Sequence, residues 1–158
     1  IDGMASAVGF AQCYFYANCV WGMGGAVAVL ENGNHTAFEG TVFHNNVALG
    51  NVSSGGAVAS INSAPSFFNC TFNGNKVLRS LEGSDNALPH PSEDYAGGGG
   101  IFAVNTSNYK MVVSSCVFTD NDLRASRLDG SALLLFNATV VVEESFFSAN
   151  DRKKRTAL

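Results

Sequence analysis

Charged residues are scarce in this sequence: they make up 14% of its 158 residues, against about 25% in an ordinary soluble domain. Lysine and arginine together number 9, and the net charge is -4. Nucleic-acid binding depends on basic groups that neutralise phosphates, and no Lys or Arg precedes Lys76. We therefore expect no nucleic acid among the partners of this chain.

Long apolar runs and helical periodicity are also missing. Runs such as Ala132–Phe136 fall far short of the roughly 20 residues that span a bilayer, so we expect no membrane span. Short β-branched and aromatic stretches lie between Gly, Asn and Ser, which is typical of strands. With 46% hydrophobic residues, 17 glycines and only 3 prolines, the composition predicts one all-β domain with many tight turns.

Five units in which a Phe is followed three positions later by an Asn recur along the chain, with the Phe residues 28, 29, 46 and 29 positions apart. The pairs are Phe15–Asn18, Phe43–Asn46, Phe72–Asn75, Phe118–Asn121 and Phe147–Asn150. A repeat of about 29 residues cannot bury its own apolar side, but coils stacked about 4.8 Å apart can. The sequence therefore predicts a parallel β-helix of about five coils, a solenoid with an internal Phe stack and an Asn ladder. We expect one domain over residues 1–158, as a segment of a longer solenoid.

Other positions repeat in step with each Phe. Five positions earlier stands a large apolar residue: Phe10, Phe38, Phe67, Val113 or Val142. Two positions earlier stands a small residue: Cys13, Thr41, Cys70, Cys116 or Ser145. The residue before the small one is polar or Gly, which we interpret as an outward column. The odd step between the two apolar columns breaks the period of two in a flat strand, and it predicts a bend between them.

A second motif opens a short apolar strand in each interval. Its four occurrences are Gly24-Gly25-Ala26-Val27, Gly55-Gly56-Ala57-Val58, Gly99-Gly100-Ile101-Phe102 and Gly130-Ser131-Ala132-Leu133. Both faces of these strands are apolar, and such strands are normally covered on both sides. We therefore expect a neighbouring protein or another copy to pack laterally on this face.

The alternation of the two motifs resembles the polymorphic outer membrane protein repeats of chlamydial surface proteins, which are marked by the paired tetrapeptides GGA[ILV] and FxxN. The resemblance covers nearly the whole chain and departs from the pattern at Gly99-Gly100-Ile101 and Gly130-Ser131-Ala132. It implies a right-handed β-helix of the pectin-lyase-like type, exposed on a cell surface and used as an adhesive stalk.

Five Asn-x-Ser/Thr acceptors for N-linked glycans lie in expected loops or in the outward column. They are Asn34, Asn51, Asn69, Asn105 and Asn137, and none is one of the five ladder asparagines. Attached glycans need such exposure, so we predict an extracellular or cell-surface glycoprotein. The alternative is an Asn-rich passenger domain of a bacterial surface protein, in which these Asn-x-Ser/Thr sites are never glycosylated.

The four cysteines allow two disulfides. Cys70 and Cys116 hold the same column in successive coils, which would place their Cα atoms within the roughly 4.4 to 6.8 Å that a disulfide accepts. Cys13 and Cys19 are the other candidate pair, and bridges would fit an oxidising compartment. The alternative is thiols that act as small core residues. No Cys/His spacing suggests zinc, and we predict no metal and no cofactor.

Three further segments are interpreted without assigning them a specific function. Residues 78–96 lengthen one repeat and contain prolines and acidic residues; we interpret them as an inserted surface loop, which is either a binding element or a tolerated insertion. Asp120-Asn121-Asp122 has too few carboxylates for a calcium site. Arg152–Arg155 is interpreted as a solvated loop, with a convertase-type processing site as the alternative.

Catalysis is not expected, although pectin-lyase-like helices often cleave acidic polysaccharides. Glu39 and Glu143 are more than two coils apart, whereas glycoside hydrolysis needs two neighbouring carboxylates. His35, His44 and His90 have no convergent partner. We predict no catalytic residue.

The expected function is a non-catalytic structural or adhesive module of a cell-surface assembly or filament. The alternative is a carbohydrate-binding module or a polysaccharide lyase or hydrolase. Partners would be further coils or other protein chains, packed laterally or end to end, because the ladder residues run to both ends without polar caps. Glycans are a further candidate partner.

Overall fold

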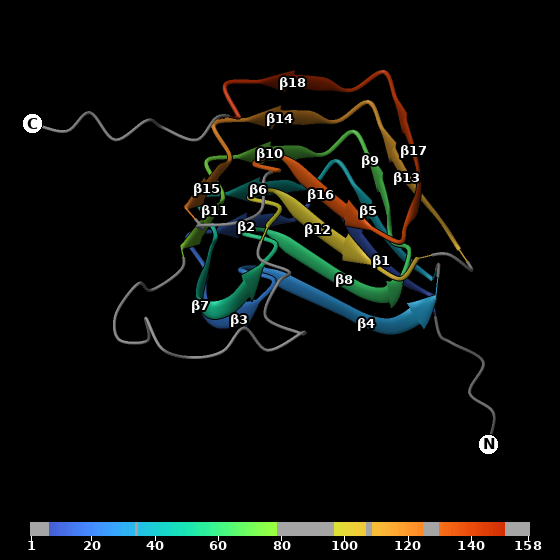
Figure 1. The fold of residues 1–158 in the computed structure, drawn as a ribbon. Coiled ribbons are helices and arrows are strands. Elements are labelled where there is room, and N and C mark those ends of the chain that lie inside the picture. The colour runs from blue at the N-terminus through green and yellow to red at the C-terminus, as the bar shows by residue number, and fades with distance from the viewer. Residues whose placement is uncertain (1–6, 34, 79–96, 107–108, 125–129, 151–158) are drawn as a thin grey trace, which may run out of the picture.

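The computed structural model describes residues 7–33, 35–78, 97–106, 109–124 and 130–150. These residues form 18 short β-strands and no helix. The strands join into four parallel sheets, here A to D, and each coil contributes one strand to each sheet in turn (Figure 1). As the chain climbs from β2 to β18, it runs from left to right along the front of Figure 1 and returns behind, which is a right-handed coil. The predicted parallel β-helix is confirmed.

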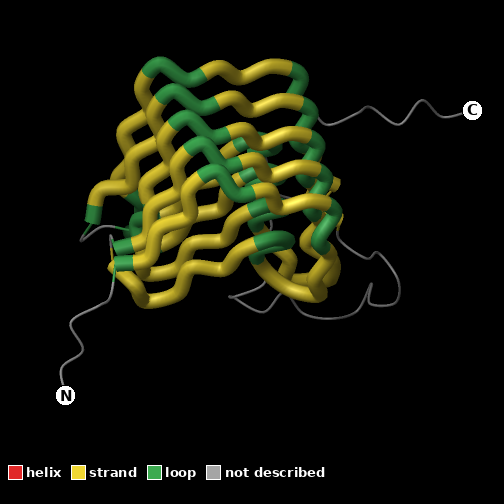
Figure 2. Tube along the Cα trace, turned by 180° about the vertical axis from the view of Figure 1, so that it is seen from behind, coloured by secondary structure: helices red, strands yellow, loops and turns green. Residues whose placement is uncertain are grey.

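Sheets A and B have five strands each, and Figure 2 looks onto them from outside. Sheet A contains β1 (Val8–Ala11), β5 (Thr36–Glu39), β9 (Ser66–Phe68), β13 (Lys110–Ser114) and β17 (Thr139–Glu143). Sheet B contains β2 (Tyr14–Tyr16), β6 (Val42–His44), β10 (Thr71–Asn73), β14 (Val117–Thr119) and β18 (Phe146–Ser148).

Sheets C and D have four strands each. Sheet C contains β3 (Cys19–Met23), β7 (Val47–Ser54), β11 (Lys76–Leu78) and β15 (Asp122–Arg124). Sheet D contains β4 (Val27–Gly33), β8 (Val58–Ser63), β12 (Ile101–Val104) and β16 (Leu133–Phe136). The described residues therefore make four turns, and β17 and β18 begin a fifth.

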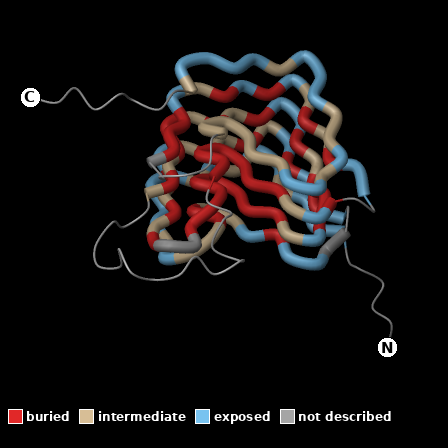
Figure 3. Tube along the Cα trace, in the orientation of Figure 1, coloured by how far each residue is buried: buried red, intermediate tan, exposed pale blue. Residues whose placement is uncertain are grey.

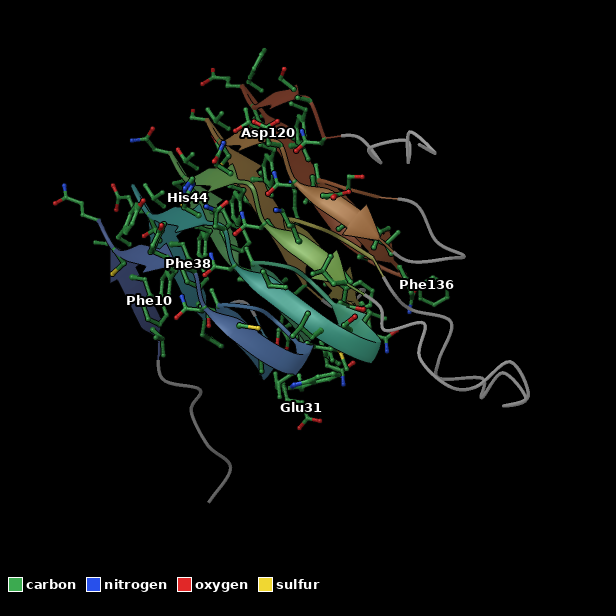
Figure 4. All side chains as sticks on the ribbon, turned by 90° about the vertical axis from the view of Figure 1, so that its left-hand side faces the viewer. Phe10, Glu31, Phe38, His44, Asp120 and Phe136 are labelled. Atoms are coloured by element: carbon green, nitrogen blue, oxygen red, sulfur yellow. The ribbon has the colours of Figure 1, made fainter. Side chains whose placement is uncertain are left out.

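The Phe column of the FxxN units is the centre of the core. Its five rings stack in register, with centroids 4.5 to 5.1 Å apart and planes within 6° of parallel. Phe10, Phe38 and Phe67 form a second stack on sheet A, with centroids 4.9 and 5.0 Å apart. The two stacks meet edge to face, the arrangement that aromatic quadrupoles favour. Burial is greatest in the middle coils and least in the end coils (Figure 3).

The coil turns at residues with left-handed φ angles. Between sheets A and B these are Gln12, Gly40, Asn69, Ser115 and Glu144, with φ from 46° to 55°. This corner is the bend that the odd spacing predicted. Our interpretation of the column was incomplete, because these residues turn the backbone as well as pointing outward. Non-glycine residues are strained in this region, so the hydrogen bonds that flank each corner must hold it.

The corner between sheets C and D requires glycine in the first three coils, at Gly25, Gly56 and Gly99, because the backbone of the next coil approaches closely. A Cβ on Gly56 would overlap the carbonyl oxygen of Gly99 and lie 2.6 Å from the backbone N and O of Lys76. Here the structure corrects one alignment. Ile101 pairs with Val58, so the third motif is Gly98-Gly99-Gly100-Ile101 and begins one residue earlier than predicted. Four consecutive glycines, residues 97–100, left the frame undecided in the sequence.

Candidate functional site

The five ladder asparagines form a continuous hydrogen-bonded chain along the solenoid. Each Nδ2 donates to the Oδ1 of the Asn in the next coil, at 2.8 to 3.0 Å. The same Oδ1 also accepts the backbone N–H of the Asn below it. From the second coil on, Nδ2 also donates to the Phe carbonyl of the preceding coil. These residues are therefore structural, as predicted.

The small-residue column forms a second ladder at the other end of sheet B. Thr41 Oγ1 donates to backbone carbonyls of its own and the preceding coil, and Ser145 does the same. Cys70 Sγ takes this role with Phe38 O at 3.4 Å and Phe68 O at 3.3 Å. Hydroxyl and thiol groups are thus interchangeable here, because each is a small donor.

The four cysteines are free thiols, and neither predicted disulfide is present. Cys70 and Cys116 do lie in successive coils, since the Cys70 N–H donates to Cys116 Sγ at 3.4 Å. However, both Sγ atoms donate to backbone carbonyls instead of pairing with each other. The hydrogen-bonded thiol of Cys116, together with burial, raises the pKa of Cys70. Cys13 is half-buried and Cys19 is exposed.

Three of the five predicted glycan acceptors can be placed with their side chains. Asn69 is exposed at the A–B corner. Asn105 and Asn137 are exposed at the D–A corner of successive coils, where Asn137 Nδ2 donates to Asn105 Oδ1 at 3.1 Å. Asn51 lies in β7, but its side chain is outside the described residues, as is Asn34.

Several other predicted features also fall outside the described residues: His90, the inserted loop from residue 79 to 96, and Arg152–Arg155. Leu78, the first residue of the predicted loop, belongs instead to β11.

The titratable residues that can be placed do not converge. Glu39 and Glu143 lie in one column of sheet A, but Phe68 and Ser114 stand between them. His44 lies beside Asn45, with Nε2 3.1 Å from its Nδ2. In the described part of the chain, no three His, Cys, Asp or Glu residues are grouped closely enough to hold a metal ion. That part also contains no helix of the length and apolarity that a membrane span needs.

The outer face of sheet D is buried in the middle coils and open in the end coils, where Leu30 and Phe136 are 58% and 47% exposed. Ile101 and Ala103 point into the core cluster, so Phe102 between them points outward, yet it is only 2% exposed. Its column neighbour Ala59 is fully buried as well. Both faces of the sheet D strands are therefore buried at these two positions, and lateral packing of a neighbouring protein or another copy on this face stays a prediction.

The outer face of sheet B carries no charged residue. Two outward residues per strand alternate with the buried Phe column. One column is largely apolar: Tyr14, Val42, Thr71, Val117 and Phe146. The other is polar: Tyr16, His44, Asn73, Thr119 and Ser148. We call these ten residues the B strip, and its lack of charge gave no sequence signal because it appears only when the coils are stacked.

Aromatic rings gather at one end of the B strip. The rings of Tyr14 and Tyr16 lie 5.9 Å apart and 14° from parallel. Tyr16 stacks in turn on His44 of the next coil, at 5.5 Å and 10°. The two tyrosines are 64% and 57% exposed. Trp21, 76% exposed, lies on sheet C rather than on the strip.

Core columns are open at both ends of the described stack. Phe147 and Val142, in the last coil, are 41% and 43% exposed, whereas Phe118 and Val113 below them are fully buried. In the first coil, Val8 is 42% exposed. Phe10 and Phe15 of the first coil are only partly buried, so the end coils cover their inward side chains less completely than the middle coils do.

Comparison with the models of known protein families, with curated proteins and with solved structures found no match for this chain.

Proposed function

We propose that this chain is a non-catalytic structural or adhesive module of an extracellular or cell-surface assembly, joined end to end to further coils or to other protein chains. The observation that carries the proposal is the open core column at each end of the stack. Apolar core side chains of this size are normally covered, and stacked coils bury each other's faces. The alternation of glycine and FxxN motifs, whose third glycine unit fits better in its corrected frame, supports kinship with the polymorphic outer membrane protein repeats.

The association state of the purified chain tests the end-to-end proposal. We expect concentration-dependent association in light scattering, because the open columns would pair. Phe147→Lys, which charges the open column, should weaken association. Phe146→Lys is the matched control, since Phe146 points outward from the same strand. A stable monomer at all concentrations, or equal effects of both variants, would contradict the proposal.

We also propose that the chain is a glycoprotein. Asn69, Asn105 and Asn137 support this, because all three are exposed at corners, as a glycan acceptor must be. Intact mass before and after glycosidase treatment of protein from a eukaryotic secretory host is the test. An unchanged mass would contradict the glycoprotein proposal and leave the end-to-end proposal standing.

A further inference from the structure

We propose that the B strip binds one chain of an uncharged polysaccharide, laid along the solenoid axis. This site goes beyond the structural role and does not depend on it. It consists of outward-facing side chains that the scaffold holds at one coil spacing.

Charge decides which class of polymer the strip fits. None of its ten residues is Asp, Glu, Lys or Arg, whereas the outer face of sheet A carries Glu39, Lys110 and Glu143. Polyanions such as nucleic acids and acidic polysaccharides need cationic side chains. The strip offers none, and without Asp or Glu it forms no ion pair with a polycation either, so we expect its ligand to be neutral.

Size separates a polysaccharide from a protein partner. Five strands of three residues make a flat strip of roughly 20 Å by 10 Å from ordinary strand spacings. A stable protein interface buries about 800 Å² on each side, well above what such a strip provides. A single extended polymer chain matches its width. Peptide strands add to sheet edges rather than to faces.

The chemistry of the two columns fits a sugar chain. Sugar rings have C–H faces that pack against electron-rich aromatic faces, and the exposed rings of Tyr14 and Tyr16 provide these at one end. Sugar hydroxyls need partners that both donate and accept hydrogen bonds. The polar column supplies hydroxyl, imidazole and amide groups, one in each coil. Asn73 and Thr119 are held in place by a hydrogen bond of 2.6 Å between them.

Calorimetric titration with defined hexasaccharides tests the proposal. The neutral probes are cellohexaose, laminarihexaose, chitohexaose and mannohexaose, and hexagalacturonate is the anionic comparison. We expect at least one neutral probe to bind, with an affinity that changes less than twofold between 50 and 500 mM salt, since no ion pair is involved. Hexagalacturonate should bind at least tenfold more weakly.

Variants separate the strip from other exposed aromatic residues. Tyr14→Ala combined with Tyr16→Ala should weaken binding at least tenfold, and Val42→Glu, which adds a charge to the strip, should do so independently. Trp21→Ala is the matched control and should leave affinity unchanged. Thermal unfolding checks that each variant folds. The proposal is overturned if no neutral probe binds, if hexagalacturonate binds best, or if Trp21→Ala weakens binding as much as the tyrosine variant.

Discussion

Sheets A and B repeat strictly, whereas sheets C and D vary from coil to coil. The spacing from the sheet A apolar column through the Phe to the ladder Asn is identical in all five coils. By contrast, the ladder Asn is followed by the left-handed corner glycine after six residues from Asn18 to Gly24, and after 23 from Asn75 to Gly98. Register shifts also occur only in sheets C and D among the described pairs, at Trp21/Met23 and Leu30/Gly33.

The difference shows which half of the solenoid fixes the register of one coil on the next. Two side-chain ladders flank sheet B, one of Asn amides and one of hydroxyl and thiol groups, and an added residue between them would break both. The C–D side is held by apolar packing, backbone pairing and glycine contact, and none of these requires a fixed number of residues between corners. It therefore accepts insertions between corners, as surface connections generally do.

The largest expected loss of stability comes from removing a Phe ring at the centre of sheet B, in the half of the solenoid that repeats strictly. Phe72→Ala should lower the free energy of unfolding by about 3 to 5 kcal/mol, because it leaves a cavity between two stacked rings. Val77→Ala, equally buried but in sheet C, should cost about 2 kcal/mol. Urea denaturation measures both. If Val77→Ala were the more damaging, the A–B half would not be the stability centre.

The next effect is expected from breaking the Asn ladder. Asn75→Ala removes the partners of the Asn46 N–H and the Phe43 carbonyl, and should cost about 3 kcal/mol because buried groups are left unsatisfied. Asn73→Ala, two residues earlier at the end of β10 and facing outward, should cost less than about 1 kcal/mol. Equal losses of stability in thermal unfolding would show that the ladder adds no more than a surface amide.

A glycine substitution tests the C–D corner directly. Gly56→Ala should destabilise by about 1 to 3 kcal/mol, since its Cβ would force two backbones apart. Gly9→Ala has open space around the new Cβ and should change stability by less than about 1 kcal/mol. Chemical denaturation of the two variants provides the comparison. Tolerance of Gly56→Ala would mean that the corner is looser than its contacts indicate.

The smallest effect concerns reactivity rather than stability. Cys70 should react far more slowly with a thiol reagent at pH 8 than the exposed Cys19, because burial and the raised pKa keep Cys70 protonated and thiolate is the reactive form. Unfolding in denaturant should release all four thiols. Mass mapping of labelled cysteines identifies each site. A count below four in unfolded, unreduced protein would restore the disulfide prediction.

Much of the fold was predictable because the same residues recur at a regular spacing in each coil. Phe72 and Asn75 recur in step, and stacking then dictates their ladder and column. The frame of Gly98-Gly99-Gly100 was not predictable, since adjacent glycines look alike until Ile101 is paired with Val58. The disulfide prediction for Cys70 and Cys116 was wrong for a related reason. The sequence showed that the two residues share a column, but it did not show that Cys70 Sγ donates to the carbonyls of Phe38 and Phe68 on neighbouring strands.

The Asn ladder has a direction. In all four Asn–Asn bonds the Nδ2 donates toward the later coil, so these amide dipoles align along the solenoid axis. Such chains of bonds polarise one another. Asn18 receives no ladder bond and Asn150 gives none among the described residues. A folded coil is therefore a template that accepts a new coil in only one orientation. An inverted coil would set Oδ1 against Oδ1 at the Asn18 end and Nδ2 against Nδ2 at the Asn150 end. Growth of such a stack is polar, and each of its two ends would recognise only the opposite end of another.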